Sequence, residues 1–166
     1  PLFRWMCTLF PEDRVREVWK MYNVTTDSKG LACFWYADSQ GRIAYDKRVF
    51  YKEDGHRDKT FGGTREYRTA DGFTARPYFG AHLVNDECVN VVESEKSALL
   101  GALAYGGTWL ACGGKNNLKD VANAKLYPDY DAREEWASRA KDAQVVEWWQ
   151  GWSECGETSD IGDLIE

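Results

Sequence analysis

The chain has 166 residues, of which 43% are hydrophobic and 14% aromatic, so it can bury a core and is not a disordered chain. Its net charge is −6 and no apolar run approaches a membrane span, so we expect a cytoplasmic protein rather than a membrane protein. Because the chain begins at Pro1 rather than at Met, we also expect it to be part of a longer protein.

Cysteine and histidine usage argues against a disulfide framework and against zinc in this chain. The five cysteines are scattered and never form a Cys-x-x-Cys pair, which is typical of free thiols in a reducing compartment. The two histidines, His56 and His82, are too few and too far apart to indicate a zinc or general-base site.

Charge is unevenly distributed along the chain. Residues 1–90 carry 14 basic and 13 acidic residues, whereas residues 91–166 carry 7 basic and 14 acidic residues. The stretch from Gln40 to Arg76 holds 9 basic and 6 acidic residues and is therefore locally positive. A nucleic-acid-binding surface, which requires such a local excess of Lys and Arg, is thus expected only in the first half.

The first half is predicted to hold one helix and one β-hairpin. Residues 11–24, "PEDRVREVWKMYNV", place Val15, Val18 and Trp19 on one helical face after a proline and acidic first turn. Residues 30–51 contain two aromatic, apolar runs separated by "ADSQGR", which predicts a hairpin. Residues 52–72 are polar, contain glycine and lack a clear period, so we expect a loop there.

The second half alternates short apolar strands with helices. Four strands are predicted, namely "CVNVV" (88–92), "TWLAC" (108–112), "KLYP" (125–128) and "QVVEWWQ" (144–150). Helices are predicted at residues 94–106, with Ser94 as N-cap, and at residues 132–143. This spacing predicts βαβ units and a parallel sheet.

Acidic residues follow two of these predicted strands. Glu93 and Glu95 follow the first strand, and Asp129 and Asp131 follow the third. Because the carboxyl ends of parallel strands meet at one edge of a sheet, the four acids should gather there. An all-oxygen cluster suits Mg²⁺. The alternative is that these acids cap the helices that follow them, and we favour this role for Glu95, while Asp131 suits either role.

A glutamate, a Gly-Gly loop and an Asp-x-Asp pair, in this order, resemble the Toprim domain that bacterial-type primases, topoisomerases and certain nucleases share. The resemblance implies Mg²⁺-dependent (or Mn²⁺-dependent) phosphoryl transfer on nucleic acid, with Glu93, Asp129 and Asp131 as metal ligands and Glu93 as catalytic acid or base. It departs from the primase pattern at Ser94, where primases usually have Gly, and at Arg133, where they often have Gly.

The segments "YADSQGRIAYDKRVFYKEDGHR" and "PYFGAHL" resemble the basic lobe that precedes Toprim in bacterial primases, in which the second segment would form a short lead-in strand. Together with "VESEKSALL", "WLACGG" and "LYPDYD", they resemble a Toprim-like family of mobile elements and phages. We therefore expect an α/β protein in which a small, basic α+β lobe (1–87) precedes a Toprim-like, Rossmann-like parallel sheet flanked by helices (88–166).

Several further residues are candidates for the site. Asp160 and Asp163 match an acidic ending that phage-type primases often carry, and capping of a short terminal helix is the alternative. Candidates for contacts with phosphate or nucleic acid are Arg42, Lys47, Arg48, Arg57, Lys96 and Lys115. Gly113 and Gly114, which precede Lys115, let backbone N–H groups approach an anion, although the full phosphate-loop pattern is absent.

Two aromatic residues of the hairpin, Trp35 and Tyr45, are available for stacking on bases, although we favour the core for Trp35. The leading functional hypothesis is a primase-like nucleotidyltransferase that serves DNA replication of a mobile element. Its expected partners are single-stranded DNA, nucleotides and a replicative helicase. The alternatives are an inactive Toprim module that binds DNA or a protein partner, and a Toprim nuclease.

Overall fold

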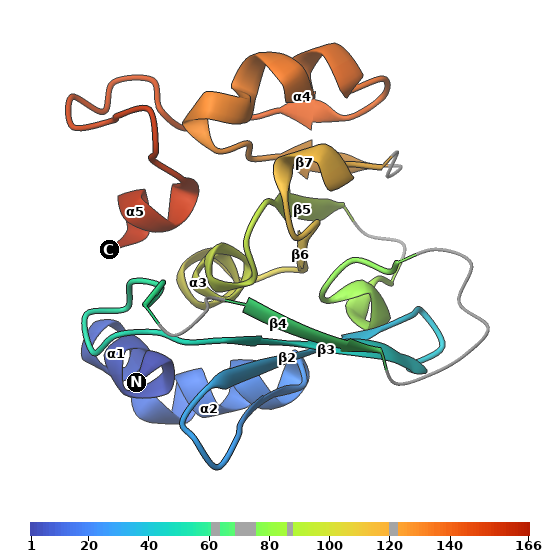
Figure 1. The fold of residues 1–166 in the computed structure, drawn as a ribbon. Helices are drawn as coiled ribbons and strands as arrows, with labels where there is room; N and C mark the ends of the chain where they lie inside the picture. Colours follow the sequence, from blue (N-terminus) through green and yellow to red (C-terminus); the bar gives the residue numbers. More distant parts are fainter. Residues whose placement is uncertain (61–63, 69–75, 86–87, 120–122) are drawn as a thin grey trace. The chain divides into compact units, whose positions relative to one another are not determined.

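The computed structural model describes residues 1–166 except 61–63, 69–75, 86–87 and 120–122 (Figure 1). The chain divides into two compact units, Pro1–Leu83 and Val84–Glu166. The boundary expected from the sequence, between residues 87 and 88, falls beside positions 86–87, which lie outside the described residues. We describe each unit by itself.

The first unit begins with two helices, α1 (Leu2–Leu9) and α2 (Glu12–Met21). The predicted helix α2 is confirmed, with Pro11 at its N-cap and a buried face made by Val15, Val18 and Trp19. Helix α1 was not predicted, although its buried residues Leu2, Trp5 and Met6 recur at helical spacing. The two helices pack together, and the indole N–H of Trp19 donates to the sulfur of Met6 at 3.4 Å.

An antiparallel sheet completes the first unit, with the strand order β1-β2-β3-β4 (Figure 1). Its strands are β1 (Val24–Thr26), β2 (Ala32–Ala37), β3 (Ile43–Val49) and β4 (Thr64–Arg68). Strands β2 and β3 form the predicted hairpin. The loop predicted at residues 52–72 was wrong for β4, which is an edge strand of this sheet. Its pairing with β3 satisfies backbone groups that β3 would otherwise expose.

The segment that was expected to form a short lead-in strand, residues 77–83, forms none. Ala81–Leu83 is instead a 3₁₀ turn, η1, which packs against β2. Phe79 explains this conformation, because its ring is buried against Tyr22, Phe34 and Tyr36 with centroids 5.5, 5.5 and 5.6 Å away. Burial of such a ring contributes about 1.5–3 kcal/mol and holds the segment in this conformation.

The second unit contains the predicted parallel sheet, with the strand order β6-β5-β7-β8 (Figure 1). Its strands are β5 (Val89–Val92), β6 (Trp109–Ala111), β7 (Ala124–Leu126) and β8 (Gln144–Val145). Its helices are α3 (Glu95–Tyr105), α4 (Arg133–Arg139) and α5 (Ile161–Ile165), with 3₁₀ turns η2 (Lys115–Asn117) and η3 (Tyr130–Ala132). The α/β class is therefore confirmed, although α4 and β8 are shorter than predicted.

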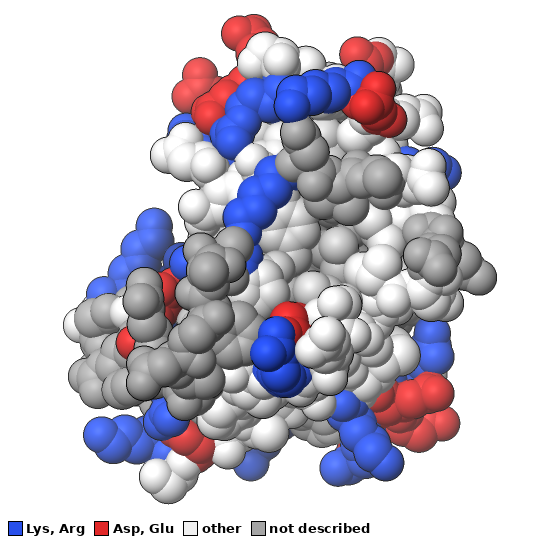
Figure 2. Space-filling view, turned by 90° about the vertical axis from the view of Figure 1, so that its right-hand side faces the viewer, with Lys and Arg blue, Asp and Glu red and all other residues white. Residues whose placement is uncertain are grey.

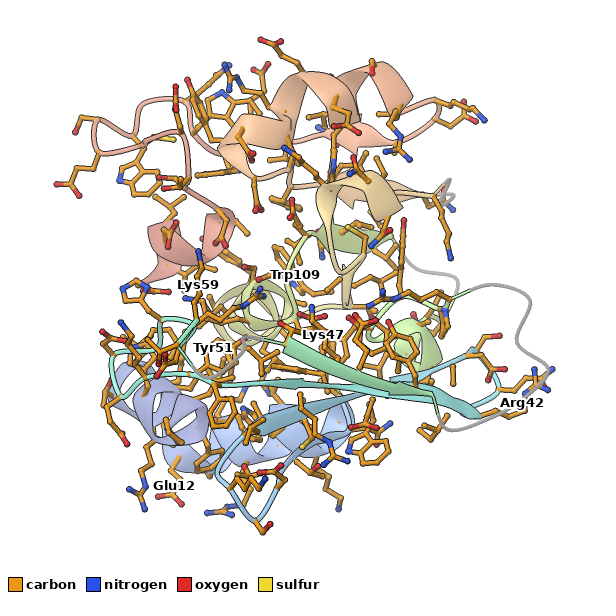
Figure 3. The ribbon with its side chains drawn as sticks, in the orientation of Figure 1. Glu12, Arg42, Lys47, Tyr51, Lys59 and Trp109 are labelled. Atoms are coloured by element: carbon orange, nitrogen blue, oxygen red, sulfur yellow. The ribbon has the colours of Figure 1, made fainter. Side chains whose placement is uncertain are left out.

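Helix α3 is the buried helix of this unit and packs against β5, β6 and α5. Ser94 is its N-cap, as predicted, and its hydroxyl accepts a hydrogen bond from the backbone N–H of Ser97 at 3.1 Å. The indole of Trp109, which is labelled in Figure 3, packs against α3 at Gly101. A Cβ at Gly101 would lie 2.4 Å from the indole, so only glycine allows this contact.

Replacing Gly101 by Ala should therefore destabilise the second unit, by roughly 2 kcal/mol or more, because the fully buried indole has to shift. In an unconstrained helix the same change stabilises by about 1 kcal/mol. Urea unfolding of the two proteins measures the difference, with the exposed Ala104→Gly as a propensity control. An increase in stability in Gly101→Ala would contradict the packing described.

No helix in the described ranges is both long and apolar enough to cross a membrane. The five cysteines are free, and among them Cys33 and Cys112 are buried.

Candidate metal centre at the carboxyl edge of the parallel sheet

The order of the parallel strands creates a switch point beside β5. The chain leaves β5 through α3 to reach β6 on one side, whereas β7 pairs with the other side of β5. Open α/β sheets bind their ligands at such a point, beyond the carboxyl ends of the strands. Glu93 directly follows β5, and Asp129 and Asp131 follow β7, so adjacent strands bring these acids to the same place.

Glu93 is the central acid of this edge. Its carboxylate accepts a hydrogen bond from the backbone N–H of Lys115 and forms a side-chain hydrogen bond with Asp129. Its Oε2 atom is buried and has no hydrogen-bond partner in the described part of the chain. Desolvation and the charge of Asp131 raise the pKa of Glu93. A buried carboxylate oxygen without a donor is costly unless something else approaches it.

Asp129 is half-buried and forms a side-chain hydrogen bond with Glu93. Burial, followed by the charges of Glu93, Asp160 and Asp131, raises the pKa of Asp129 to about 9. The pair is therefore expected to share one proton at neutral pH, as two carboxylates in hydrogen-bond contact do.

Asp131 is the exposed member of the three and has a different partner. Its Oδ2 atom lies 3.1 Å from Nζ of Lys115, and about half of each side chain is exposed. The hydrogen bond with Asp131 raises the pKa of Lys115. Asp131 is thus in an ion pair with Lys115, while Glu93 and Asp129 are joined by a hydrogen bond.

The acids near the end of the chain have a capping role in the structure. Asp160 is the N-cap of α5, where its carboxylate accepts from the backbone N–H groups of Gly162 and Asp163, and Asp163 accepts from the N–H of Asp160 in return. Asp160 also accepts from the hydroxyl of Ser97 at 3.0 Å. Its charge still acts on Asp129, so α5 brings a fourth carboxylate close to the edge. No local pattern in the sequence indicated the contact between Asp160 and Ser97.

Two candidates on α3 are occupied by internal contacts. Glu95 is fully buried in the first turn, which agrees with a structural role. Lys96 forms an ion pair with Glu166 at 2.5 Å, and only 12% of its side chain is exposed. The ammonium of Lys96 is thus bound to a carboxylate in this structure, and a contact between Lys96 and a phosphate stays a prediction.

The residues present fit Mg²⁺ in the way that this cation is usually held. Within the described ranges, no group of three or more His, Cys, Asp or Glu side chains is arranged to hold a metal ion. Mg²⁺ is, however, commonly bound by one or two carboxylates, several waters and the phosphates of a substrate. Glu93, with its unpartnered Oε2, and Asp129 supply such a pair, and Asp131 could complete it after leaving Lys115.

Three of the four basic candidates in the first unit are paired or buried. Arg42, at the end of the hairpin in Figure 3, pairs with Asp38 at 2.7 Å, and Arg48 pairs with Asp46 at 2.6 Å. Lys47 projects from the middle of β3 and is buried, whereas Arg57 is exposed. On the face in Figure 2, described basic and acidic side chains are interspersed, without a broad area of basic residues alone.

The two aromatic candidates of the hairpin differ in their burial. Trp35, which we expected in the core, is only partly buried, and its indole N–H donates to the hydroxyl of Thr25 at 2.9 Å. Tyr45 is buried and stacks on Tyr36 with ring centroids 4.2 Å apart, while the guanidinium of Arg76 lies 4.6 Å from the Tyr45 centroid. Tyr45 pairs with Tyr36 across the hairpin, so both side chains lie on one face of the sheet. Trp35 precedes Tyr36, and its side chain therefore lies on the opposite face, because successive side chains of a strand alternate.

Comparison with known families decides the assignment of the chain. Residues 1–128 match the family described as "Domain of unknown function (DUF6371)". The chain belongs to this family. No curated protein matches the chain.

Two solved structures of bacteriophage T7 proteins share the fold. The primase fragment of the T7 primase-helicase protein is 18% identical over 79% of this chain, with a TM-score of 0.54. The chain covers 60% of the length of that fragment. The second structure is an assembly of the T7 lagging-strand DNA polymerase with primase domains that are bound to an RNA/DNA hybrid and dTTP. The matching chain in it is 17% identical to this chain, with a TM-score of 0.51. The match covers 89% of this chain and 79% of that chain. The chain therefore has a primase-like fold.

Proposed function

We propose that this chain is the Toprim-like, Mg²⁺-dependent core of a primase-like nucleotidyltransferase that serves the replication of a mobile element. The observation that supports this proposal most is the pair of half-buried carboxylates, Glu93 and Asp129, at the switch point of a primase-like sheet, with Asp131 beside them. The unpartnered Oε2 of Glu93 indicates a site that is completed by a ligand.

In nucleotidyl transfer, a 3′-hydroxyl oxygen forms a bond to the α-phosphorus of a nucleoside triphosphate while the bond to pyrophosphate breaks. Bound Mg²⁺ (or Mn²⁺) would supply neutralisation of the phosphate charge at this edge. Glu93 and Asp129, joined by Asp131, would hold the ion. The raised pKa of Glu93 also suits it to accept the proton that the hydroxyl loses.

The proposed substrates are single-stranded DNA as template and nucleoside triphosphates. In support, the T7 neighbour with the same fold is bound to an RNA/DNA hybrid and dTTP. The other T7 neighbour is part of a primase-helicase protein, and we propose by analogy that a replicative helicase is a partner of this chain. Because the chain covers only part of that neighbour, further modules could supply template binding.

A second candidate function is a binding module that has lost catalysis. It is favoured by the ion pair between Lys115 and Asp131, which occupies one of the three proposed metal ligands. Such a module would bind single-stranded DNA or a protein partner without turnover. A Toprim nuclease, the third candidate, would use the same acids.

Titration calorimetry with Mn²⁺ and Mg²⁺ tests the proposal first. We expect the native chain to bind either ion and the Asp129→Asn/Asp131→Asn double variant to lose that binding, because Glu93 is then the only one of the three proposed ligands that keeps its carboxylate. The titration is repeated with single-stranded DNA, which can complete a partly formed site. Assays of primer synthesis and of DNA cleavage on the same samples then separate the primase-like from the nuclease function.

Equal metal binding by the native chain and the double variant would refute the metal site. Metal binding without primer synthesis or cleavage would favour the binding module over both enzymes.

A further inference from the structure

Lys115 connects the Gly-Gly loop after β6 to two of the three acids. Its backbone N–H donates to the carboxylate of Glu93, and its Nζ atom lies 3.1 Å from Oδ2 of Asp131. Its carbonyl oxygen accepts from the indole N–H of the buried Trp136 at 3.2 Å. One residue thus contacts the acids that follow both β5 and β7.

The backbone around Lys115 is held in place by the loop that precedes it. The N–H of Gly113 donates to the carbonyl oxygen of Glu93 at 2.8 Å, and the N–H of Cys112 donates to that of Val92 at 3.0 Å. Gly113 and Gly114 have φ values of 75° and 144°, which residues with a Cβ rarely adopt. The main chain of Lys115 is therefore fixed, while its side chain, 44% exposed, can turn.

The ion pair with Lys115 affects how Asp131 is oriented. With Oδ2 bound to an ammonium, Asp131 does not join Glu93 and Asp129 around one point, which agrees with the lack of a three-ligand group among the described residues. The acidic groups that act on Lys115 are Asp131, Glu135 and Glu93. The ammonium of Lys115 therefore reduces the repulsion between the carboxylates at this edge of the sheet.

We infer that Lys115 is a positioning residue that neutralises Asp131 in the metal-free protein and moves to the phosphates of the incoming triphosphate when a divalent cation takes Asp131. This inference rests on the proposed metal site. It goes further in assigning one side chain two successive partners, a carboxylate and then a phosphate. The substrate class that it implies is a nucleoside triphosphate with its phosphates at the Gly113–Lys115 loop.

Two titrations of Lys115→Met should change in opposite directions. With Mn²⁺ alone, the variant should bind about two- to fivefold more tightly than the native chain, because a half-exposed ion pair no longer competes for Asp131. With inorganic triphosphate in the presence of saturating Mg²⁺, it should bind about tenfold more weakly, because a charge-assisted contact with phosphate is lost. A side chain that only supports the loop would not produce this reversal.

The matched variants are Lys115→Arg and Lys125→Met. Lys115→Arg keeps the positive charge and should restore most of the triphosphate affinity. Lys125 is an exposed lysine on β7 without a role at the edge, and its replacement should change neither titration. Melting temperatures of all variants, measured in EDTA, show whether each protein is folded.

The outcomes separate this inference from the proposed function. Metal binding that is the same in the native chain and in Lys115→Met would overturn the role of Lys115 and leave the metal site standing. A change of both affinities in the same direction would also overturn it. If neither protein binds Mn²⁺ with or without single-stranded DNA, the proposed metal site fails and this inference fails with it. Binding by Lys115→Met alone would support the inference, since it identifies the ammonium as the competitor.

Discussion

Glu93→Gln is expected to lower metal-dependent primer synthesis by about 10³-fold or more. The amide keeps the size of the side chain but removes its negative charge and its ability to accept a proton. Metal-assisted charge stabilisation contributes several kcal/mol to such reactions, and each 1.36 kcal/mol corresponds to roughly a factor of ten in rate. Glu93 carries this effect because its Oε2 is the unpartnered oxygen of the edge.

The measurement is incorporation of labelled nucleotides on single-stranded DNA, at saturating Mn²⁺, by the native chain and by Glu93→Gln. Glu134→Gln is the matched control, because Glu134 lies in the first turn of α4 near the same edge and its side chain is 90% exposed. We expect the control to retain activity within a factor of two or so, as exposed substitutions usually do. A loss below tenfold in Glu93→Gln would show that Glu93 is not at the reacting centre.

The second large effect concerns the stability of the metal-free protein. The pKa of Asp129 is raised from 3.8 to about 9, chiefly by burial and by Glu93, so the folded protein keeps a proton that the unfolded chain has lost. The free energy of unfolding should therefore fall as pH rises from about 4 to about 9, by up to ~1.4 kcal/mol per pH unit. The raised pKa values of Glu93 and Asp160 act in the same direction.

Asp129→Asn removes the carboxyl group that contributes most to this pH dependence of the free energy of unfolding. In EDTA at pH 8, the variant should melt several degrees above the native chain, since 1 kcal/mol corresponds to roughly 2–4 °C for a chain of this size. Melting curves at intervals between pH 5 and pH 9 show whether the two proteins diverge as pH rises. Added Mg²⁺ should stabilise only the native chain, because the ion replaces the proton between the carboxylates. If the melting temperatures of the two proteins changed in parallel with pH, the proton-sharing pair of Glu93 and Asp129 would be refuted.

A gain in stability that accompanies a loss of function is typical of residues selected for chemistry rather than for folding. The two predictions together thus distinguish a metal site from helix capping. Removing a capping carboxylate costs stability, by about 1 kcal/mol, at every pH where the carboxylate is ionised.

The amino-acid sequence alone predicted the elements whose signals are local. The apolar period of α2, the N-cap Ser94 before α3 and the turn between β2 and β3 are each carried by residues that are close together in the chain. The alternation of strands and helices after residue 88 was likewise sufficient for the parallel sheet, because short parallel strands need helical crossovers. The position of the acids at strand ends followed from the same pattern.

The tertiary structure alone decided which partner each acidic side chain has. Glu93 and Asp129 form a pair because β5 and β7 are neighbours, and the strand order is a long-range property that no local pattern records. Strand β4 and the turn at Phe79 were missed for the same reason, since pairing with β3 and burial of a ring against distant residues form them. Lys115 shows this limit most clearly, because the sequence placed it beside two glycines, and only the fold placed its ammonium on Asp131.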